Sequence, residues 1–287
     1  MMPLWAAQAG TAHGIRNRVW TPAPHTGTNA GMHHSFTLPR RTAISCALAL
    51  CLSAGAQART ISGQRVQVSA PCLSTLHVVT DHTLSDGVDI PEAWPAGLQS
   101  ATAADGTITL TQTGCPSGQN LELHTPSTMP LAIDSPQATR IVIDTRKGPL
   151  SIQSGSGGIE LRRTGPIDLA SDSSGPIHID TLAGSARLRS TTSAPIIIRQ
   201  INAPALAVYL AGTASLSAPA GTLKALDINN TGKGDASFGG TTGVAALHVQ
   251  GSGNISVHKA TGTVATERDG KGRIDVNLPD ASSTQQN

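Results

Sequence analysis

The sequence predicts an all-β protein built as a single-stranded, right-handed parallel β-helix, a solenoid with about 19 residues per coil. Three observations predict it: a recurring phrase of one turn residue followed by apolar-x-apolar, a constant spacing between alternate copies, and few aromatic (2%) or charged (13%) residues. Each phrase has the alternation of a short strand with one buried face. A unit this short cannot fold alone, so we expect the copies to stack.

The phrase is clearest over residues 148–198, where six copies follow one another. They are Gly148–Ile152, Gly157–Leu161, Gly165–Leu169, Gly175–Ile179, Gly184–Leu188 and Ala194–Ile198. Glycine and proline at the turn positions suit sharp corners, because glycine tolerates positive φ and proline presets φ. Alternate copies form two series, so two strands are expected to make one coil, and each series its own parallel sheet.

The residue between the two apolar positions of each copy is expected to face solvent, beside its counterpart one coil away. The first series gives the ladder Ala132, Ser151, Asp168, Arg187, Ala207, Asp227, His248 and Ala265; the second gives Glu122, Val142, Glu160, His178, Ile197, Ser215, Ser237, Ser256 and Asp275. The span 65–277 then predicts roughly 11 coils, right-handed as parallel crossovers usually are. One longer step predicts an insertion near 221–234. An antiparallel sandwich is the alternative, but it would not keep a fixed 19-residue spacing.

Residues 1–58 predict a signal peptide. Arg40 and Arg41 precede an apolar run at 43–52, which is too short for a permanent membrane span. A small-x-small motif follows, and we expect cleavage after Ala58.

Two start positions remain open, Met1 and Met32; with the second, residues 1–31 are an extension ahead of the true start. Residues 59–278 are then the β-helix domain, and the polar residues 279–287 a disordered tail.

Two cysteines, Cys72 and Cys115, remain after the signal peptide is removed. A pair in an exported chain most simply forms a disulfide, here closing a loop of 44 residues. The alternative, a metal or redox pair, lacks Cys-x-x-Cys spacing.

The charge balance excludes several classes of partner. The whole chain has a formal charge of +2, but residues 1–58 hold four basic and no acidic residues, so the remainder carries 16 basic against 18 acidic. This near-neutral body has no electrostatic footprint for DNA, RNA or anionic lipid. No later apolar run reaches membrane-spanning length, so we expect no membrane span in the mature chain.

Several glycine-rich corners carry a family resemblance. Gly155–Ile159, Ser173–Ile177, Gly232–Asp235 and above all Gly251–Val257 resemble the Gly-Ser-Gly-(Asp/Asn)-Ile signature of the putative auto-transporter adhesin head GIN domain family. The resemblance covers about 62–277. It implies an exported bacterial single-stranded β-helix, from a family mostly without an assigned biochemical activity.

The outward residues predict little chemistry. Glu160 beside His178, and Asp168 beside Arg187, are pairs of the kind that solvated strands carry. His248 and His258 are expected on different sides, so no shared metal is predicted. Serine-nucleophile, zinc-protease and phosphate-loop motifs are missing from the sequence. We therefore expect no catalytic residue, no cofactor and no metal.

Ile197 is an apolar residue in an outward position, and with His178 and Ser215 it forms a candidate contact surface. The predicted function is an exported, non-catalytic module, either for binding and adhesion or for envelope structure, in the periplasm or outside the cell. Its partner is unidentified, with a cell-envelope or surface glycan or a protein as candidates. The alternative is a carbohydrate-active β-helix enzyme, a polysaccharide lyase or glycosidase, which would need acidic clusters.

Overall fold

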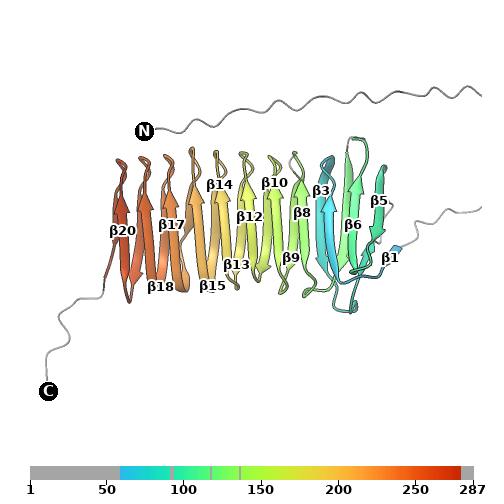
Figure 1. The fold of residues 1–287 in the computed structure, drawn as a ribbon, viewed down its shortest axis with the longest axis horizontal. Helices are drawn as coiled ribbons and strands as arrows, with labels where there is room; N and C mark the ends of the chain where they lie inside the picture. Colours follow the sequence, from blue (N-terminus) through green and yellow to red (C-terminus); the bar gives the residue numbers. More distant parts are fainter. Residues whose placement is uncertain (1–58, 91–93, 117, 136, 279–287) are drawn as a thin grey trace, which may run out of the picture. The chain divides into compact units, whose positions relative to one another are not determined.

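The computed structural model describes residues 59–90, 94–116, 118–135 and 137–278, and every regular element in them is a β-strand (Figure 1). The predicted signal peptide with its cleavage site after Ala58, the alternative start at Met32 and the tail 279–287 lie outside the described residues. Among the described residues there is no helix of the length and apolarity that crossing a membrane requires.

The strands form one continuous hydrogen-bonded system. In chain order they are β1 Arg59–Ile61, β2 Arg65–Ser69, β3 Leu73–Thr80, β4 Val88–Ile90, β5 Leu98–Thr102, β6 Thr107–Gln112, β7 Gln119–Thr125, β8 Leu131–Ser135, β9 Arg140–Thr145, β10 Leu150–Ser154, β11 Ile159–Thr164, β12 Ile167–Ser171, β13 Ile177–Leu182, β14 Ala186–Ser190, β15 Ile196–Leu210, β16 Leu216–Ala218, β17 Gly221–Asn230, β18 Ala236–Val249, β19 Ile255–Ala260, β20 Val264–Arg268 and β21 Ile274–Val276.

From β8 onward the strands build the predicted parallel solenoid, in eight coils that follow the chain order. One sheet stacks β8, β10, β12, β14, the last part of β15, the last part of β17, the last part of β18, and β20. The other stacks β9, β11, β13, the first part of β15, β16, the first part of β18, β19 and β21. The all-β fold class and the spacing of roughly 19 residues per coil are confirmed.

Inward side chains stack in columns, which explains why so few aromatic residues are needed. Ile141, Ile159, Ile177 and Ile196 are register partners in successive coils and are at most 1% exposed. Burying each such side chain stabilises the fold by about 1.5–3 kcal/mol. The narrow space between the sheets accepts aliphatic residues, and Phe238 is its one buried aromatic side chain in the described part.

The first coils are stacked out of chain order. β2 pairs with β8 on one edge and β6 on the other, and β3 pairs in the same way with β9 and β7. The coil 65–80 therefore lies between the coil 107–125 and the coil that begins at Leu131, as Figure 1 shows for β3, β6 and β8. The prediction of roughly 11 coils in simple succession is therefore wrong. Eight coils follow the chain order (the ordered coils), and the coils 65–80 and 107–125 (the exchanged coils) are stacked in the reverse of their chain order. The repeat pattern marks a segment as a strand, but it does not encode which strand lies beside it.

A buried arginine fixes the position of the segment 126–130. This segment, here called the returning segment, connects β7 to β8 and so leads the chain past the coil 65–80. Arg146 is 1% exposed, and its guanidinium donates hydrogen bonds to the hydroxyl of Thr125 and to the carbonyls of Pro126 (2.9 Å) and Met129. The next residues reinforce the contact, because the amides of Lys147 and Gly148 both donate to Ser127 O.

Short antiparallel strands cover the outer edge of the exchanged coils. β5 pairs with β6, while β4 pairs with both β1 and β7. This arrangement satisfies backbone groups that an uncapped parallel edge would leave open to another chain.

Cys72 and Cys115 form a disulfide, with Cα atoms 5.1 Å apart. Cys72 lies in the turn between β2 and β3, and Cys115 lies in the turn between β6 and β7. The predicted pairing is confirmed, and the bond joins the two exchanged coils at the same corner.

Two register partners predicted for the ordered coils are wrong. Ser217, not Ser215, is the register partner of Ile197, and Ala246, not His248, is the partner of Asp227. The buried residues on either side of Ser217 are Leu216 and Ala218, and those on either side of Ala246 are Ala245 and Leu247. Alanine is a weak apolar signal, so a frame shifted by two residues looks equally good. With this register the steps from Ile197 to Ser217 and from Ser217 to Ser237 are both 20 residues, so the predicted insertion near 221–234 disappears.

Two histidines contact Glu122, His124 from the same strand β7 and His77 from the neighbouring coil. His124 Nε2 lies 2.8 Å from Glu122 Oε1, and His77 Nδ1 lies 3.4 Å from Oε2. His77 stands between Glu122 and Val142, which the sequence placed side by side. The hydrogen bond from His124, followed by the contact with His77, holds the pKa of Glu122 below its ordinary 4.5.

A carboxyl group whose pKa is lower in the folded state stabilises the fold above its ordinary value and loses this contribution as the pH falls. We expect the urea midpoint of the wild type to fall more steeply below pH 4.5 than that of Glu122→Gln. Equal slopes in the two proteins would show that the Glu122 cluster does not contribute.

A candidate binding groove along one sheet

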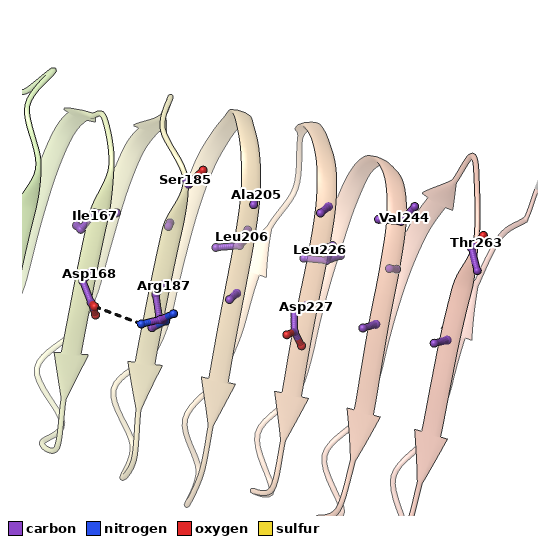
Figure 2. Close-up of a pocket in the computed structure, with 16 residues that line it drawn as sticks. Ile167, Asp168, Ser185, Arg187, Ala205, Leu206, Leu226, Asp227, Val244 and Thr263 are labelled. Atoms are coloured by element: carbon purple, nitrogen blue, oxygen red, sulfur yellow. Dashed lines mark ion pairs between the residues drawn. The ribbon is translucent and has the colours of Figure 1, made fainter.

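A shallow apolar groove crosses the outer face of the sheet that contains β12, β14 and β20 (Figure 2). It encloses about 570 Å³. Its lining residues come from successive coils and are Ile167, Asp168, Ser185, Ala186, Arg187, Ala205, Leu206, Ala207, Ala225, Leu226, Asp227, Val244, Ala245, Ala246, Thr263 and Ala265. The groove therefore runs across the strands and along the stack of coils.

Small outward residues create the hollow. Ala207, Ala246 and Ala265 occupy the outward ladder of this sheet, where other coils carry longer side chains. An alanine methyl group extends only a short distance from the sheet, so the surface is lower at these positions than beside longer side chains. Val244, at the corner before this ladder, is 46% exposed and gives the groove an apolar side.

A second hollow of about 460 Å³ continues the groove toward β8. The two share Ile167, Asp168 and Ser185. Prolines line the corner here, and the remaining lining residues are Arg65, Pro130, Leu131, Ala132, Pro149, Leu150, Ser151 and Pro166. Together the hollows span the eight strands from β8 to β20, or seven strand spacings, about 34 Å.

Few charges interrupt this surface. Asp168 Oδ2 lies 3.7 Å from a guanidinium nitrogen of Arg187, and both side chains are well exposed. Asp227 is the other carboxylate among the described lining residues, three strands from Asp168, which is about 14 Å. Glycosidases hold their two carboxyl groups about 5–9.5 Å apart. The groove carboxylates are therefore too far apart to act as such a pair.

The predicted contact residues lie on the other sheet. His178 and Ile197 are register partners and line a hollow of about 760 Å³. Ser215 is not among its lining residues, and its carbonyl accepts a hydrogen bond from the amide of Ile196. The role of His178 and Ile197 in partner contact stays a prediction.

Charged rows surround these residues. Asp144, Arg162, Asp180 and Arg199 alternate in sign along the same hollow. An ion pair joins Arg199 to Asp180 at 2.7 Å. Glu160 is the register partner of His178, as predicted, but its carboxylate pairs with Arg140 at 2.7 Å. The arrangement suits a solvated polar face better than a reaction centre.

The groove was not predicted from the sequence, although part of its signal is present there. Ala207 and Ala265 already stood at outward ladder positions in the predicted register. Small residues at successive outward positions indicate a depression, but its depth depends on the corner residues of neighbouring coils. The corners at β8, β10 and β12 share a proline, but those of the later coils do not, so no single motif marks the whole groove.

The structure defines a parallel β-solenoid with an elongated groove on one sheet, and comparison with known proteins agrees on the fold. Residues 158–279 match the family model described as "Putative auto-transporter adhesin, head GIN domain". The family that the glycine-rich corners resemble is thereby confirmed for this part of the chain. No curated protein matches the sequence.

Solved structures show the same fold at low sequence identity. A putative adhesin from Bacteroides fragilis NCTC 9343 superimposes with a TM-score of 0.53 at 15% identity, covering 77% of this chain and 96% of that chain. A putative lipid binding protein from Parabacteroides distasonis ATCC 8503 gives 0.53 at 14%, with the same coverage. A putative adhesin from Parabacteroides merdae ATCC 43184 gives 0.51 at 14%, covering 77% and 95%.

Proposed function

We propose that this chain is an exported, non-catalytic binding module of the adhesin type, located in the periplasm or outside the cell. Its groove holds the apolar chain of an elongated envelope molecule. The observation that carries the proposal is the pair of adjoining, mainly apolar hollows along the outer face of one sheet, with Ala207, Ala246 and Ala265 on the floor of the larger one. Apolar surface that is open to water favours a ligand that covers it.

The shape and lining of the groove support a chain-like ligand. At about 34 Å it is far longer than it is deep, so an extended molecule fits better than a compact one. Its floor is formed by alanine methyl groups, with charges confined to Asp168, Arg187 and Asp227 in the main hollow. One structural neighbour is described as a putative lipid binding protein, which fits an acyl chain as the apolar part.

Export is supported by the disulfide between Cys72 and Cys115, because such bonds persist in oxidising compartments. The adhesin description of the matching family points the same way. The predicted signal peptide ending at Ala58 belongs to the same proposal.

The proposal is tested with cis-parinaric acid, a fatty acid whose fluorescence rises when its chain enters an apolar site. We expect saturable binding to the wild type, and affinity at least about tenfold lower in Ala207→Glu and Ala246→Glu, because each places a carboxylate on the apolar floor. Ser237→Glu is the matched control, since Ser237 holds an outward ladder position on the other sheet. It is expected to bind like the wild type.

Two results would contradict this proposal. Binding that is absent, or equally strong in the groove variants and the wild type, would remove the groove as the site. Cleavage of polysaccharides by the purified chain, with or without calcium, would favour the carbohydrate-active alternative instead.

A further inference from the structure

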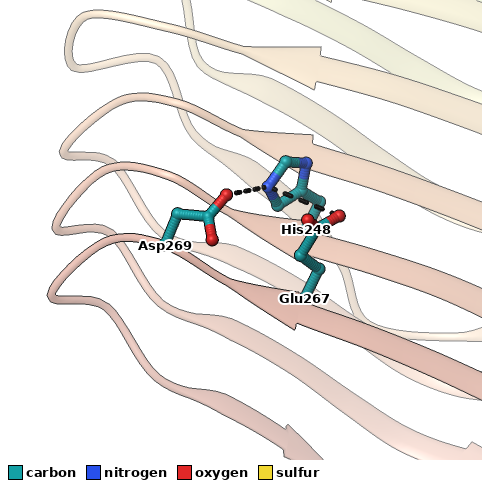
Figure 3. A group of neighbouring side chains, drawn as sticks. All are labelled: His248, Glu267 and Asp269. Atoms are coloured by element: carbon teal, nitrogen blue, oxygen red, sulfur yellow. Dashed lines mark hydrogen bonds and ion pairs between the residues drawn. The ribbon is translucent and has the colours of Figure 1, made fainter.

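Three potential metal ligands meet near the last coils, beside the groove (Figure 3). His248 on β18 is the register partner of Glu267 on β20. Asp269 follows β20, and its amide donates a hydrogen bond to Val249 O at 2.9 Å. Backbone hydrogen bonding between the coils therefore fixes the Cα positions of all three residues.

Their donor atoms have the spacing of ligands around one small cation. Asp269 Oδ2 lies 3.1 Å from His248 Nε2, and Glu267 Oε2 lies 3.8 Å from the same nitrogen. One ligand atom from each residue falls within 4.8 Å of the others. Tetrahedral zinc, with bonds of about 2.1 Å, places its ligand atoms about 3.4 Å apart. The two nitrogen–oxygen distances bracket this value.

An amide oxygen next to the cluster is an independent indication of a ligand. Asn229 is the register partner of His248 on its other side, and it lines the same hollow as His248 and Glu267. Its Oδ1 atom is buried and accepts no hydrogen bond from any described residue. A buried oxygen without a partner is costly unless something else satisfies it.

We propose that His248, Glu267 and Asp269 bind a divalent transition-metal ion of the zinc class. An imidazole nitrogen with two carboxylate oxygens suits zinc better than calcium or magnesium, which prefer all-oxygen sites. The two carboxylates balance the charge of the ion, and Asn229, whose amide oxygen has no hydrogen-bond partner among the described residues, lines the same hollow. The site does not depend on what the groove binds.

Isothermal titration calorimetry of the purified chain with zinc chloride tests the site. We expect one equivalent to bind, with affinity at least about 100-fold lower in His248→Ala and in Glu267→Gln, and about tenfold lower in Asn229→Ala. Calcium at equal concentration is expected not to compete. His178→Ala is the matched control, since His178 also lies beside a glutamate, Glu160, on the other sheet, and it should bind zinc like the wild type.

Each contrary result is decisive. No zinc binding by the wild type, or unchanged affinity in His248→Ala, overturns the site. Equal loss in His178→Ala would show unspecific binding, and competition by calcium would contradict the zinc class. Urea unfolding of each variant checks its fold, and because Glu267 and Asp269 are exposed and His248 is only half-buried, we expect midpoints close to that of the wild type.

Discussion

Arg146→Ala is expected to lower the free energy of unfolding by about 3–5 kcal/mol, because a large buried side chain and its hydrogen bonds to three neighbouring residues are lost together. The guanidinium bonds Thr125, Pro126 and Met129, so alanine leaves these acceptors buried without a donor and opens a cavity. Burial lowers the pKa of Arg146 to about 10, so the group is still charged at neutral pH. Carbonyl oxygens of the returning segment stabilise that charge.

Urea unfolding followed by far-UV circular dichroism measures this effect. Arg187→Ala is the matched control, because Arg187 makes an exposed ion pair worth at most about 1 kcal/mol. If Arg146→Ala were as stable as Arg187→Ala, the arginine would not be holding the returning segment.

Loss of the disulfide has the second large expected effect. Cys72→Ser should lower the free energy of unfolding by about 4 kcal/mol, because the bond closes a long loop and restricts the unfolded chain. Cys115→Ser should have the same effect, and the double variant should lose no more than either single one, since all three remove one bond. Reduction of the wild type with dithiothreitol should reproduce the loss. Additive losses in the double variant would mean that the cysteines act separately.

The repeat predicted the ordered part of the fold well. Over 148–198 five of the six copies have isoleucine or leucine in both inward positions, and only Gly184–Leu188 has an alanine, Ala186, in one of them. The frame is therefore well defined, and the pairs Glu160–His178 and Asp168–Arg187 are correct. The alternation of inward and outward residues was assigned two positions too early at Ser215 and two positions too late at His248. In both places an alanine fills an inward position, so two assignments fit the sequence equally well.

The order of the first coils could not be predicted for a different reason. The coil 65–80 and the coil 107–125 carry the same alternation as the rest, and either could pack against the strand at Leu131. The choice depends on tertiary contacts, such as the hydrogen bonds of Arg146 to the returning segment. A single arginine in an inward column gives no indication of its partners until the fold is known.

The candidate sites also depend on contacts between coils. The groove needs alanines from coils about 20 residues apart to align, and the proposed zinc site needs His248 and Glu267 to be register partners. The predicted ladder had displaced His248 by two positions, so its true neighbours were hidden.

Methyl NMR of the chain labelled with ¹³C-alanine tests the binding groove most directly, because its floor is made of alanine methyl groups. Titration with a fatty acid is predicted to shift Ala207, Ala225 and Ala246, and to leave the exposed Ala101 of β5 unchanged. Shifts confined to alanines outside the groove, with these three unchanged at saturation, would contradict the account.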